Sequence, residues 1–351
     1  MATEVRREPL VSLPRIPVVP VLGGILVLLV AVWLVVNAIK TPSEFYALFL
    51  IGLTNGAVYG LVALGYSLVY GILELINFAH GDVFMLGGML AATFALDVFV
   101  LASGESAAVL LPAVAVTLLA CMAFCGGLNA TIELVAYRRL RGAPRLAPLI
   151  TAIGMSFILQ NVGLAWKGAR PVSLPDPTLP RTELFTIAGV PYTLDKLIVL
   201  LITVPVLMGL IYLVQQTRQG KAMRATAQDR EAAAMMGINV NRTISFTFLI
   251  AGMLAGAAGL IYAFYVTNIG FLEGFRVGLI CFTAAVFGGI GNLPGAVLGA
   301  LVIGMIESFN NGLSWFAPGS DWTQSIIFGI LILILVFRPE GLLGERTPEG
   351  A

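Results

Sequence analysis

The feature that most limits what this chain can fold into is a succession of long apolar segments. A membrane-crossing helix needs about 20 predominantly apolar residues, and ten segments approach or reach that length. The eighth and ninth are shorter than a full crossing and could form a re-entrant pair. The sequence therefore predicts an all-α, polytopic membrane protein with about 8–10 transmembrane helices. The segments lie near residues 18–39, 46–70, 83–101, 107–136, 146–166, 197–215, 244–266, 277–290, 293–307 and 323–337.

The composition agrees with a membrane protein and argues against nucleic-acid binding. Hydrophobic residues make up 58% of the chain and charged residues 11%, against about 25% charged in a typical soluble domain. The net charge of +1 leaves no basic patch of the kind that binds nucleic acid. Three cysteines, Cys121, Cys125 and Cys281, lie in apolar stretches without neighbouring His or further Cys. We therefore expect buried packing residues there and no metal site.

The basic residues predict the orientation of the chain in the membrane. If the N-terminus is cytoplasmic, 14 of the 20 Lys and Arg residues fall on the cytoplasmic side, as the positive-inside bias requires. The first apolar run is too long for a cleavable signal peptide. We therefore expect cytoplasmic tails at 1–17 and 338–351 and a membrane permease domain over 18–337. A cytoplasmic segment at 216–243 and an outer loop at 167–196 interrupt that domain.

Small residues suggest tight helix packing and a possible internal duplication. Gly52 and Gly56, and likewise Gly252 and Gly256, are four residues apart, a spacing that lets helix backbones approach closely in lipid. The two stretches read G-L-T-N-G-A and G-M-L-A-G-A, and their spans would cross in opposite directions. The match favours a possible inverted repeat of two halves, an architecture that places a solute path at the interface.

Two interruptions of the apolar pattern indicate where a solute path could lie. One is E-L-I-N-F-A-H-G-D at Glu74–Asp82, and the other is G-G-I-G-N-L-P-G at Gly288–Gly295. Unwound backbone at membrane depth must line a cavity or be buried in protein. The polar residues in and near these Gly/Pro-interrupted segments are therefore candidates for the solute path or a gate: Asn55, Tyr59, Asn77, His80, Asp82 and Asn292.

Several of these polar residues also have structural interpretations. Asp82 is expected more as a helix cap at the start of the third span than as a gate, whereas both roles stay open for Asn77 and His80. One His and one Asp do not make a metal site. Glu133 precedes a cluster of arginines and is expected to form a structural ion pair with them, and Glu307 to face water or a basic partner.

The polar stretch from Gly220 to Arg242 separates two spans. It mixes charged and small residues over two or three helical turns, and Gly237 is placed to end the helix as a C-cap. Such a short amphipathic helix can dock in a groove of a soluble partner. It can equally lie on anionic lipid through its basic residues.

Resemblance to a known family favours the first alternative. Glu231-Ala232-Ala233 followed by Gly237 resembles the E-A-A-x-x-x-G motif by which permeases of ABC importers contact their ATPase subunits. The I-x-L-P continuation seen in other importers is absent. Four blocks resemble the branched-chain amino-acid permease family of the LivH type, and the resemblance extends over about residues 46–340. The blocks are Asn55–Asp82, Ala136–Ser156, Arg224–Ile238 and Phe287–Gly299.

The resemblance implies a permease subunit of an ATP-driven importer in the bacterial inner membrane, with leucine, isoleucine or valine as solute. It implies partners as well: two ATPase subunits that bind ATP and Mg, a second permease subunit, and a periplasmic or lipid-anchored binding protein. The chain itself is expected to be no enzyme and to hold no cofactor, since it lacks a G-x-x-x-x-G-K-[ST] phosphate loop. The residues expected to couple to the ATPase are Arg224, Asp229, Arg230, Glu231, Ala232, Ala233 and Gly237.

Other functions stay open at this point. Related permeases carry other amino acids, urea or short amides, so the same importer class could serve another solute. A secondary transporter is more remote, because it would need an ionisable relay buried at mid-membrane. Most acids of this chain fall at span ends or in interruptions instead.

Overall fold

The computed structural model of the chain describes residues 18–102, 106–144, 146–175, 178–187, 190–338 and 340–344. The expected tail at 1–17, Arg145 and most of the tail at 338–351 lie outside the described residues. The chain divides into two units, Met1–Pro42 and Ser43–Ala351. The first contains α1 (Val18–Lys40), an apolar helix of 23 residues. All further elements belong essentially to the second unit.

The second unit is a bundle of membrane-length helices. Eight helical stretches of the described residues are long and apolar enough to cross a membrane, which confirms the expected all-α polytopic class. Their main helices are α2 (Pro42–Leu73), α3 (Ala79–Thr93), α4 (Ala107–Ile132), α5 (Leu146–Lys167), α6 (Leu194–Gln216), α9 (Val240–Val266), α11 (Leu293–Gly312) and α12 (Thr323–Phe337).

The eighth and ninth apolar segments fold differently from each other. The eighth becomes α10 (Glu273–Gly288), which has 16 residues and is short for a crossing. The ninth was expected to be short as well, but α11 has 20 residues and reaches crossing length. The sequence pattern stopped at 307 because polar residues follow it, and the helix continues through them to Gly312.

Short irregular elements extend or connect the long helices. A π-helical turn, η1 (Phe94–Val98), continues α3, while η2 (Glu133–Tyr137) and the 3-10 turn η3 (Arg138–Leu140) continue α4. Another 3-10 turn, η4 (Ser320–Trp322), precedes α12. The strands are brief: β1 (Val172–Ser173) pairs antiparallel with β4 (Asn268–Ile269), and β2 (Glu183–Ile187) with β3 (Val190–Thr193).

The core forms around α3 and α9, which are buried over most of their length. α3 packs against α4, α5, α9 and α10. At Gly252 of α9 an added Cβ would lie 2.3 Å from the carbonyl oxygen of Cys125, and at Gly256 it would lie 2.3 Å from that of Cys121. The expected close packing along this glycine row is therefore confirmed, as is the burial of the cysteines.

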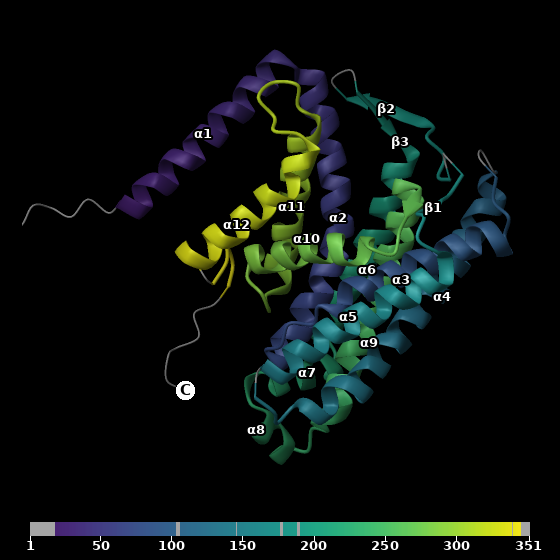
Figure 1. Cartoon of the computed structure of the whole chain (residues 1–351), viewed down its shortest axis with the longest axis vertical. Coiled ribbons are helices and arrows are strands. Elements are labelled where there is room, and N and C mark those ends of the chain that lie inside the picture. The colour runs from purple at the N-terminus through teal and green to yellow at the C-terminus, as the bar shows by residue number, and fades with distance from the viewer. Residues whose placement is uncertain are drawn as a thin grey trace, which may run out of the picture. The chain divides into compact units, whose positions relative to one another are not determined.

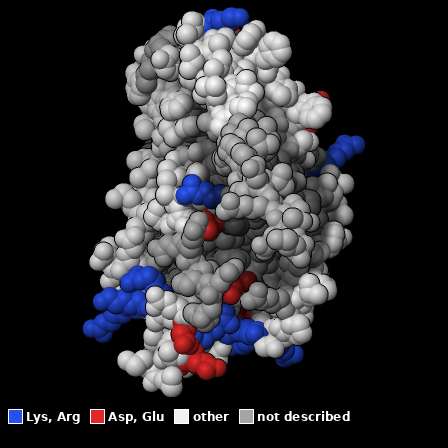
Figure 2. All heavy atoms as spheres, turned by 90° about the vertical axis from the view of Figure 1, so that its left-hand side faces the viewer, with Lys and Arg blue, Asp and Glu red and all other residues white. Residues whose placement is uncertain are grey.

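The two ends of the bundle differ in character. The β2–β3 hairpin lies toward one end of the long axis, and α7 (Arg218–Gln228) and α8 (Arg230–Met235) lie at the opposite end (Figure 1). Figure 2 shows Lys, Arg, Asp and Glu side chains gathered at this α7–α8 end, while most of the rest of that face is uncharged. The polar segment between the spans therefore lies at the most charged end of this face.

Candidate functional site

The segment after α6 turns sharply because of one glycine. Thr217 caps α7 by accepting a hydrogen bond from the backbone N–H of Gly220 over 3.1 Å. At Gly220 a Cβ would lie only 2.2 Å from the carbonyl oxygen of Val214. Only glycine fits this turn without displacing the end of α6, and the turn directs α7 back beside the bundle.

Asp229 divides the segment into two helices, so the single short helix expected over Gly220–Gly237 is wrong in this detail. Asp229 is extended, and its carboxylate accepts hydrogen bonds from the N–H groups of Glu231 and Ala232 over 2.8 and 3.0 Å. An Asp at this position favours the start of a new helix. The result is α8, a short helix that begins at Arg230 and carries the E-A-A motif in its first turn.

Gly237 ends α8 as the sequence predicts. Its φ of +83° lies in the left-handed region, where residues with a Cβ are strained. Its N–H donates to the carbonyl of Ala234, and the N–H of Ile238 donates to that of Ala233 over 3.0 Å each. The paired bonds satisfy free carbonyls at the helix end in the manner of a C-terminal cap.

The end of α8 and its following turn expose two large apolar side chains. Met235 and Met236 are 82% and 83% exposed, and Glu231 is exposed beside them. Ala232 is partly exposed, whereas Ala233 is only 4% exposed and packs inside the segment. A large side chain at Ala233 would therefore disturb the segment itself. The two methionines were missed by the sequence analysis, although adjacent methionines in an otherwise polar stretch are a usable signal for a docking surface.

Two arginines fasten the segment to the spans before and after it. Arg230 donates from Nη2 to the carbonyl of Ile72 over 2.9 Å, and Arg224 donates to the carbonyl of Val214. Both carbonyls belong to the last turn of a helix, α2 or α6, where backbone acceptors lack partners within the helix. These residues, expected to couple to a partner, thus also hold the segment against the bundle.

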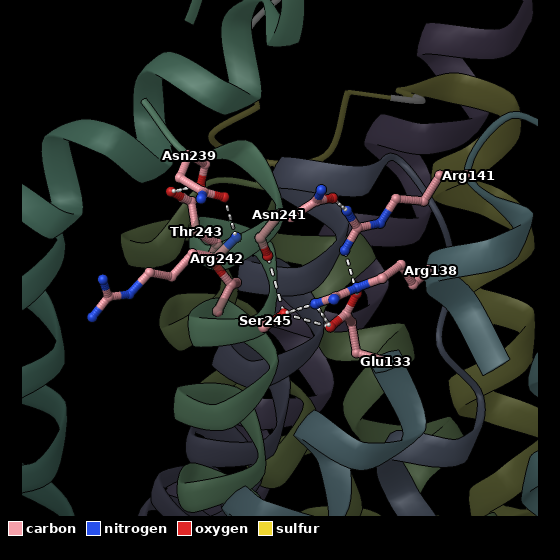
Figure 3. A network of polar contacts seen from close by, with 9 residues as sticks. Glu133, Arg138, Arg141, Asn239, Asn241, Arg242, Thr243 and Ser245 are labelled. Carbon is pink, nitrogen blue, oxygen red and sulfur yellow. Dashed lines mark hydrogen bonds and ion pairs between the residues drawn. The ribbon is translucent and has the colours of Figure 1, made fainter. Parts of the chain in front are cut away.

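A buried ion-pair network anchors the other side of the segment (Figure 3). Glu133, fully buried at the end of α4, pairs with Arg138 over 3.3 Å and with Arg141. Ser245 of α9 donates to the same carboxylate over 2.6 Å, and Arg141 donates to Asn241 over 2.5 Å. The structural ion pair expected for Glu133 is confirmed. Asn241 and Ser245 were missed as members of this site, because they contact Arg141 and Glu133 from positions at least 100 residues away.

The network has a direct consequence for the coupling segment. Asn239 caps α9 by accepting from the N–H of Arg242 over 3.0 Å, only two residues after Gly237. Burial lowers the pKa of the Arg141 guanidinium, whereas the adjacent Glu133 carboxylate raises it. Only a few residues therefore separate Gly237 from the network, since Asn239 caps α9 and Asn241 bonds Arg141.

Two cavities border the segment. One, of about 320 Å³, is lined by Glu74, Arg141 and Arg230 among others. The second, of about 420 Å³, is lined by residues of α2, α6, α7 and the α10–α11 turn, including Arg224 and Asn292. Both cavities place charged groups of the coupling segment next to the C-terminal end of α2.

Three candidate gate residues, Asn77, His80 and Asp82, lie inside the bundle. Asn77 is 3% exposed and accepts a hydrogen bond from the hydroxyl of Tyr137 over 2.8 Å. His80 is fully buried and packs edge-on against Tyr66, with ring centroids 4.8 Å apart. These contacts seal both side chains between helices in this conformation. They support packing rather than direct solute contact for this state.

Asp82 does not act as the expected helix cap. The residue preceding α3, Phe78, caps nothing with its side chain, and Asp82 itself sits within the first turn. Its Oδ2 accepts a hydrogen bond from the Ser156 hydroxyl of α5 over 2.5 Å. Because α5 packs against α3, the Ser156 hydroxyl reaches the Asp82 carboxylate, which bonds it in place of the backbone N–H groups of α3. The carboxylate therefore links two spans.

The other solute-path candidates differ in environment. Tyr59 is buried in α2, and its hydroxyl donates to Glu307 of α11 over 2.6 Å. Asn55, one turn earlier, is half-buried. Asn292 caps α11 by accepting from the N–H of Gly295 over 2.9 Å and donates to the carbonyl of Leu343. Within the described part of the chain, no group of three or more His, Cys, Asp or Glu could hold a metal ion.

Comparison with known proteins bears on this architecture. The family model for the branched-chain amino acid transport system permease component matches residues 48–336. The high-affinity branched-chain amino acid transport system permease protein BraD of Pseudomonas aeruginosa is 39% identical over 305 residues, which cover 85% of this chain and 95% of BraD. The corresponding protein LivH of Escherichia coli is 35% identical over 303 residues, with the same coverage. The fructose import permease protein FrcC of Rhizobium meliloti is 25% identical, covering 61% of this chain and 58% of FrcC.

Proposed function

Because the chain belongs to the family of branched-chain amino acid transport system permease components, we propose that it is the membrane-spanning permease subunit of an ATP-driven ABC importer. It forms the translocation path for leucine, isoleucine and valine. The observation that carries the proposal is the family match, which extends over nearly the whole helical bundle. The eight membrane-length helices agree with it.

The α7–α8 segment is the proposed contact with the ATPase subunits. Met235 and Met236 present apolar surface to solvent, and Glu231 adds a charge beside them. Exposed apolar surface rimmed by polar residues is typical of protein interaction sites. Arg230 and the Glu133 network brace the segment from both sides. A movement of the docked ATPase would therefore reach α2, α4 and α9 together.

The same segment gives the proposed orientation. Arg224 and Arg230 belong to α7 and α8, and Arg141 lines a cavity together with Arg230. Positive charge concentrates on the cytoplasmic side of membrane proteins. This end therefore faces the cytoplasm, as do both termini, and the β2–β3 hairpin faces the periplasm. The location follows as the bacterial inner membrane.

Three functions of the importer are assigned to other subunits. Two ATPase subunits bind ATP and Mg and carry out hydrolysis, a second permease copy or paralogue completes the path, and a periplasmic or lipid-anchored binding protein delivers the solute. The chain itself is thus a transporter subunit and catalyses no reaction. Its lack of a phosphate-binding loop supports this division of labour.

Reconstitution tests the proposal. The complex is purified through an affinity tag on this chain from its native membrane and inserted into liposomes with its binding protein. We expect ATPase subunits to co-purify and labelled leucine uptake to require ATP. Competition by isoleucine, valine, urea and acetamide separates branched-chain amino acids from other solutes. Uptake driven by an imposed proton gradient without ATP would overturn the assignment in favour of a secondary transporter.

A further inference from the structure

The larger of the two cavities beside the coupling segment lies where two helices end and a third begins. It has a volume of about 420 Å³. Gly71 and Ile72 line it from the last turn of α2, and Val214 and Gln215 line it from the last turn of α6. Asn292 lines it from the N-cap of α11. Residues of α7 form the remaining wall, so the coupling segment borders this cavity directly.

The cavity also adjoins the second interruption of the apolar pattern, at Gly288–Gly295. The N–H of Gly291 donates to the Ser67 hydroxyl of α2 over 3.3 Å. A Cβ added at Gly71 would lie 3.6 Å from the Cα of Gly291. Ser67, Gly71 and Gly291 all line the cavity. Non-helical backbone at membrane depth is typical of solute-binding regions, and here it meets α2 and α7 around one space.

The helix ends give the cavity acceptors for a cation. The carbonyls of the last turn of a helix lack partners within the helix, and this end carries a negative partial charge. The Ile72 carbonyl already accepts a hydrogen bond from the Arg230 guanidinium over 2.9 Å. Gly71 and Gln215 belong to the same last turns of α2 and α6 and line the cavity. An ammonium group can therefore be bound here without an acidic side chain.

Arg224 gives the cavity a donor for an anion. Among the described residues that line the cavity, it is the one charged side chain. Within the described part of the chain its guanidinium bonds only the Val214 carbonyl, through Nη1, which leaves Nε and Nη2 to donate to a ligand. A guanidinium pairs with a carboxylate through two parallel hydrogen bonds. The N-terminus of α11 lines the same cavity and adds a positive partial charge.

The rest of the lining is largely apolar. Leu68 and Ile72 of α2, Val214 of α6, Met223 of α7 and Leu293 of α11 contribute aliphatic or thioether side chains. A small-molecule site typically combines such an apolar lining with a few polar groups that orient the ligand. The cavity thus offers an anion donor, cation acceptors and an aliphatic surface together.

We infer that this cavity binds a free aliphatic α-amino acid from the cytoplasmic side. The carboxylate pairs with Arg224, the ammonium group bonds carbonyls in the last turns of α2 and α6, and the side chain lies against the apolar wall. Urea, amides and simple sugars lack the paired charges. The inference rests on the proposed function and adds to it a second amino-acid site, which the binding protein does not serve.

Binding at this place has a consequence for import. The ligand would connect Arg224 of α7 to the ends of α2 and α6, and α7 belongs to the segment that is proposed to follow the ATPase. A ligand that binds one position of α7 more tightly than another shifts the population toward that position. Amino acid that accumulates in the cytoplasm should therefore slow its own import.

Cysteine protection tests binding without transport. Gln215 lines the cavity and is exposed. Gln215→Cys is introduced after the three native cysteines are replaced by Ala, and its labelling rate by a maleimide is measured in the whole complex. Inside-out vesicles are used, without ATP or binding protein. L-Leucine should slow labelling, whereas L-leucinamide, without the carboxylate, and 4-methylpentanoate, without the ammonium, should not.

Three results of this labelling would overturn the inference. The first is no effect of leucine. The second is equal protection by 4-methylpentanoate, which would indicate a site for simple carboxylates. The third is labelling that is already blocked without added solute, which would indicate a lipid or protein occupant.

Substitutions in the cavity wall test the assigned roles. Arg224→Gln should raise the leucine concentration for half-maximal protection about tenfold, the loss of a hydrogen bond to a charged group. Ala227→Leu, in the α7 wall, should abolish protection by filling the space. Arg218→Gln is the matched control, because Arg218 is an exposed cation of α7 that does not line the cavity. Its protection should equal that of the wild type.

Assembly is followed separately from binding. ATPase co-purification shows whether each variant still forms the complex. If Arg224→Gln does not assemble, Arg224→Lys keeps the charge and loses the paired hydrogen-bond geometry, and it should still weaken protection. Wild-type protection in assembled complexes of Ala227→Leu and of either Arg224 variant would overturn the inference.

Uptake into liposomes separates this inference from the proposed function. ATP and unlabelled leucine are enclosed on the cytoplasmic side, and uptake of labelled leucine is measured. Enclosed leucine should slow uptake in the wild type and in Arg218→Gln, and slow it much less in Ala227→Leu. Normal ATP-driven uptake that enclosed leucine does not slow would reject the cytoplasmic site and leave the proposed function intact. Absence of ATP-dependent leucine uptake in the wild type would reject the proposed function itself.

Discussion

Gly237 offers a perturbation whose magnitude follows from its geometry. Its φ is +83°, and an added Cβ would find nothing within 4 Å. Gly237→Ala therefore introduces no clash with other residues, only the cost of holding a side chain in the left-handed region. That cost is roughly 1–2 kcal/mol. Gly237→Asn should cost less, because Asn tolerates this conformation.

The conformational free energy that Gly237→Ala costs should destabilise the end of α8 and its following turn, and not the packed membrane helices. α8 has six residues and is exposed at its end, so unwinding its last turn is easier than distorting the packed spans. If ATPase subunits bind only the intact turn, losing 1–2 kcal/mol lowers the apparent affinity by about 5- to 30-fold. Met235 and Met236 lie in the part of the turn that would move.

The assay compares Gly237→Ala and Gly237→Asn with a matched control. Gly168 has a φ of +82° and equally open surroundings, but it follows α5 at the other side of the membrane domain. Gly168→Ala therefore carries the same backbone cost outside the coupling segment. ATPase co-purification and ATP hydrolysis stimulated by the loaded binding protein should fall in Gly237→Ala, recover in Gly237→Asn and stay at the wild-type level in Gly168→Ala.

Two outcomes would refute this reasoning. If Gly237→Ala couples as well as wild type, the turn does not form the docking surface. If Gly168→Ala reduces coupling to the same extent, the effect of Gly237→Ala is a general loss of stability and says nothing about docking.

Further predictions address the anchor, the docking surface, the packing and the orientation. Glu133→Gln should lower the stability of the solubilised protein by about 1–3 kcal/mol, because two arginines lose their counter-charge, and an unchanged thermal melt would contradict the role of the network. The double variant Met235→Ala/Met236→Ala should weaken ATPase binding at least about tenfold if both side chains become buried on docking; equal co-purification with the wild type would rule that out. Gly252→Val should prevent normal assembly, since its Cβ would lie 2.3 Å from a backbone oxygen, and a well-folded variant would show that α4 and α9 can separate. Gln228→Cys, in the background without native cysteines, should react with an impermeant maleimide only from the cytoplasmic side, and labelling of intact cells would reverse the orientation.

Much of the fold could be predicted because the bilayer imposes a simple rule on sequence. Each of α2 to α6 and α9 is marked by an apolar run long enough to cross, and the charged 216–243 segment cannot lie in lipid. The same rule failed at α11, which continues past its apolar run through polar residues; of these, Ser308 donates to the carbonyl of Leu48 and Asn310 to that of Gly319. An inverted repeat of the two halves stays a prediction.

The candidate site was predicted unevenly. Gly237 could be placed because C-cap chemistry is local, so the residue types at a few neighbouring positions reveal the backbone they favour. The new helix start at Asp229 was not predicted, although Asp is a favoured N-cap. The partners of Asp82 and Arg230 could not be placed in this way. Each lies on another helix, and sequence spacing does not encode which helix faces which.

The sequence by itself determined that the chain spans a membrane, where the polar coupling segment interrupts the spans, and which family it resembles. These properties depend on composition and local order along the chain. Only the tertiary structure decided that Ser245 of α9 bonds the Glu133 carboxylate, and that Tyr59 of α2 donates to Glu307 of α11. Residues more than 100 positions apart meet there because close packing at glycine rows sets which helix faces touch. Which helix faces touch depends on the packing of all the helices together, and no single segment of the sequence specifies it.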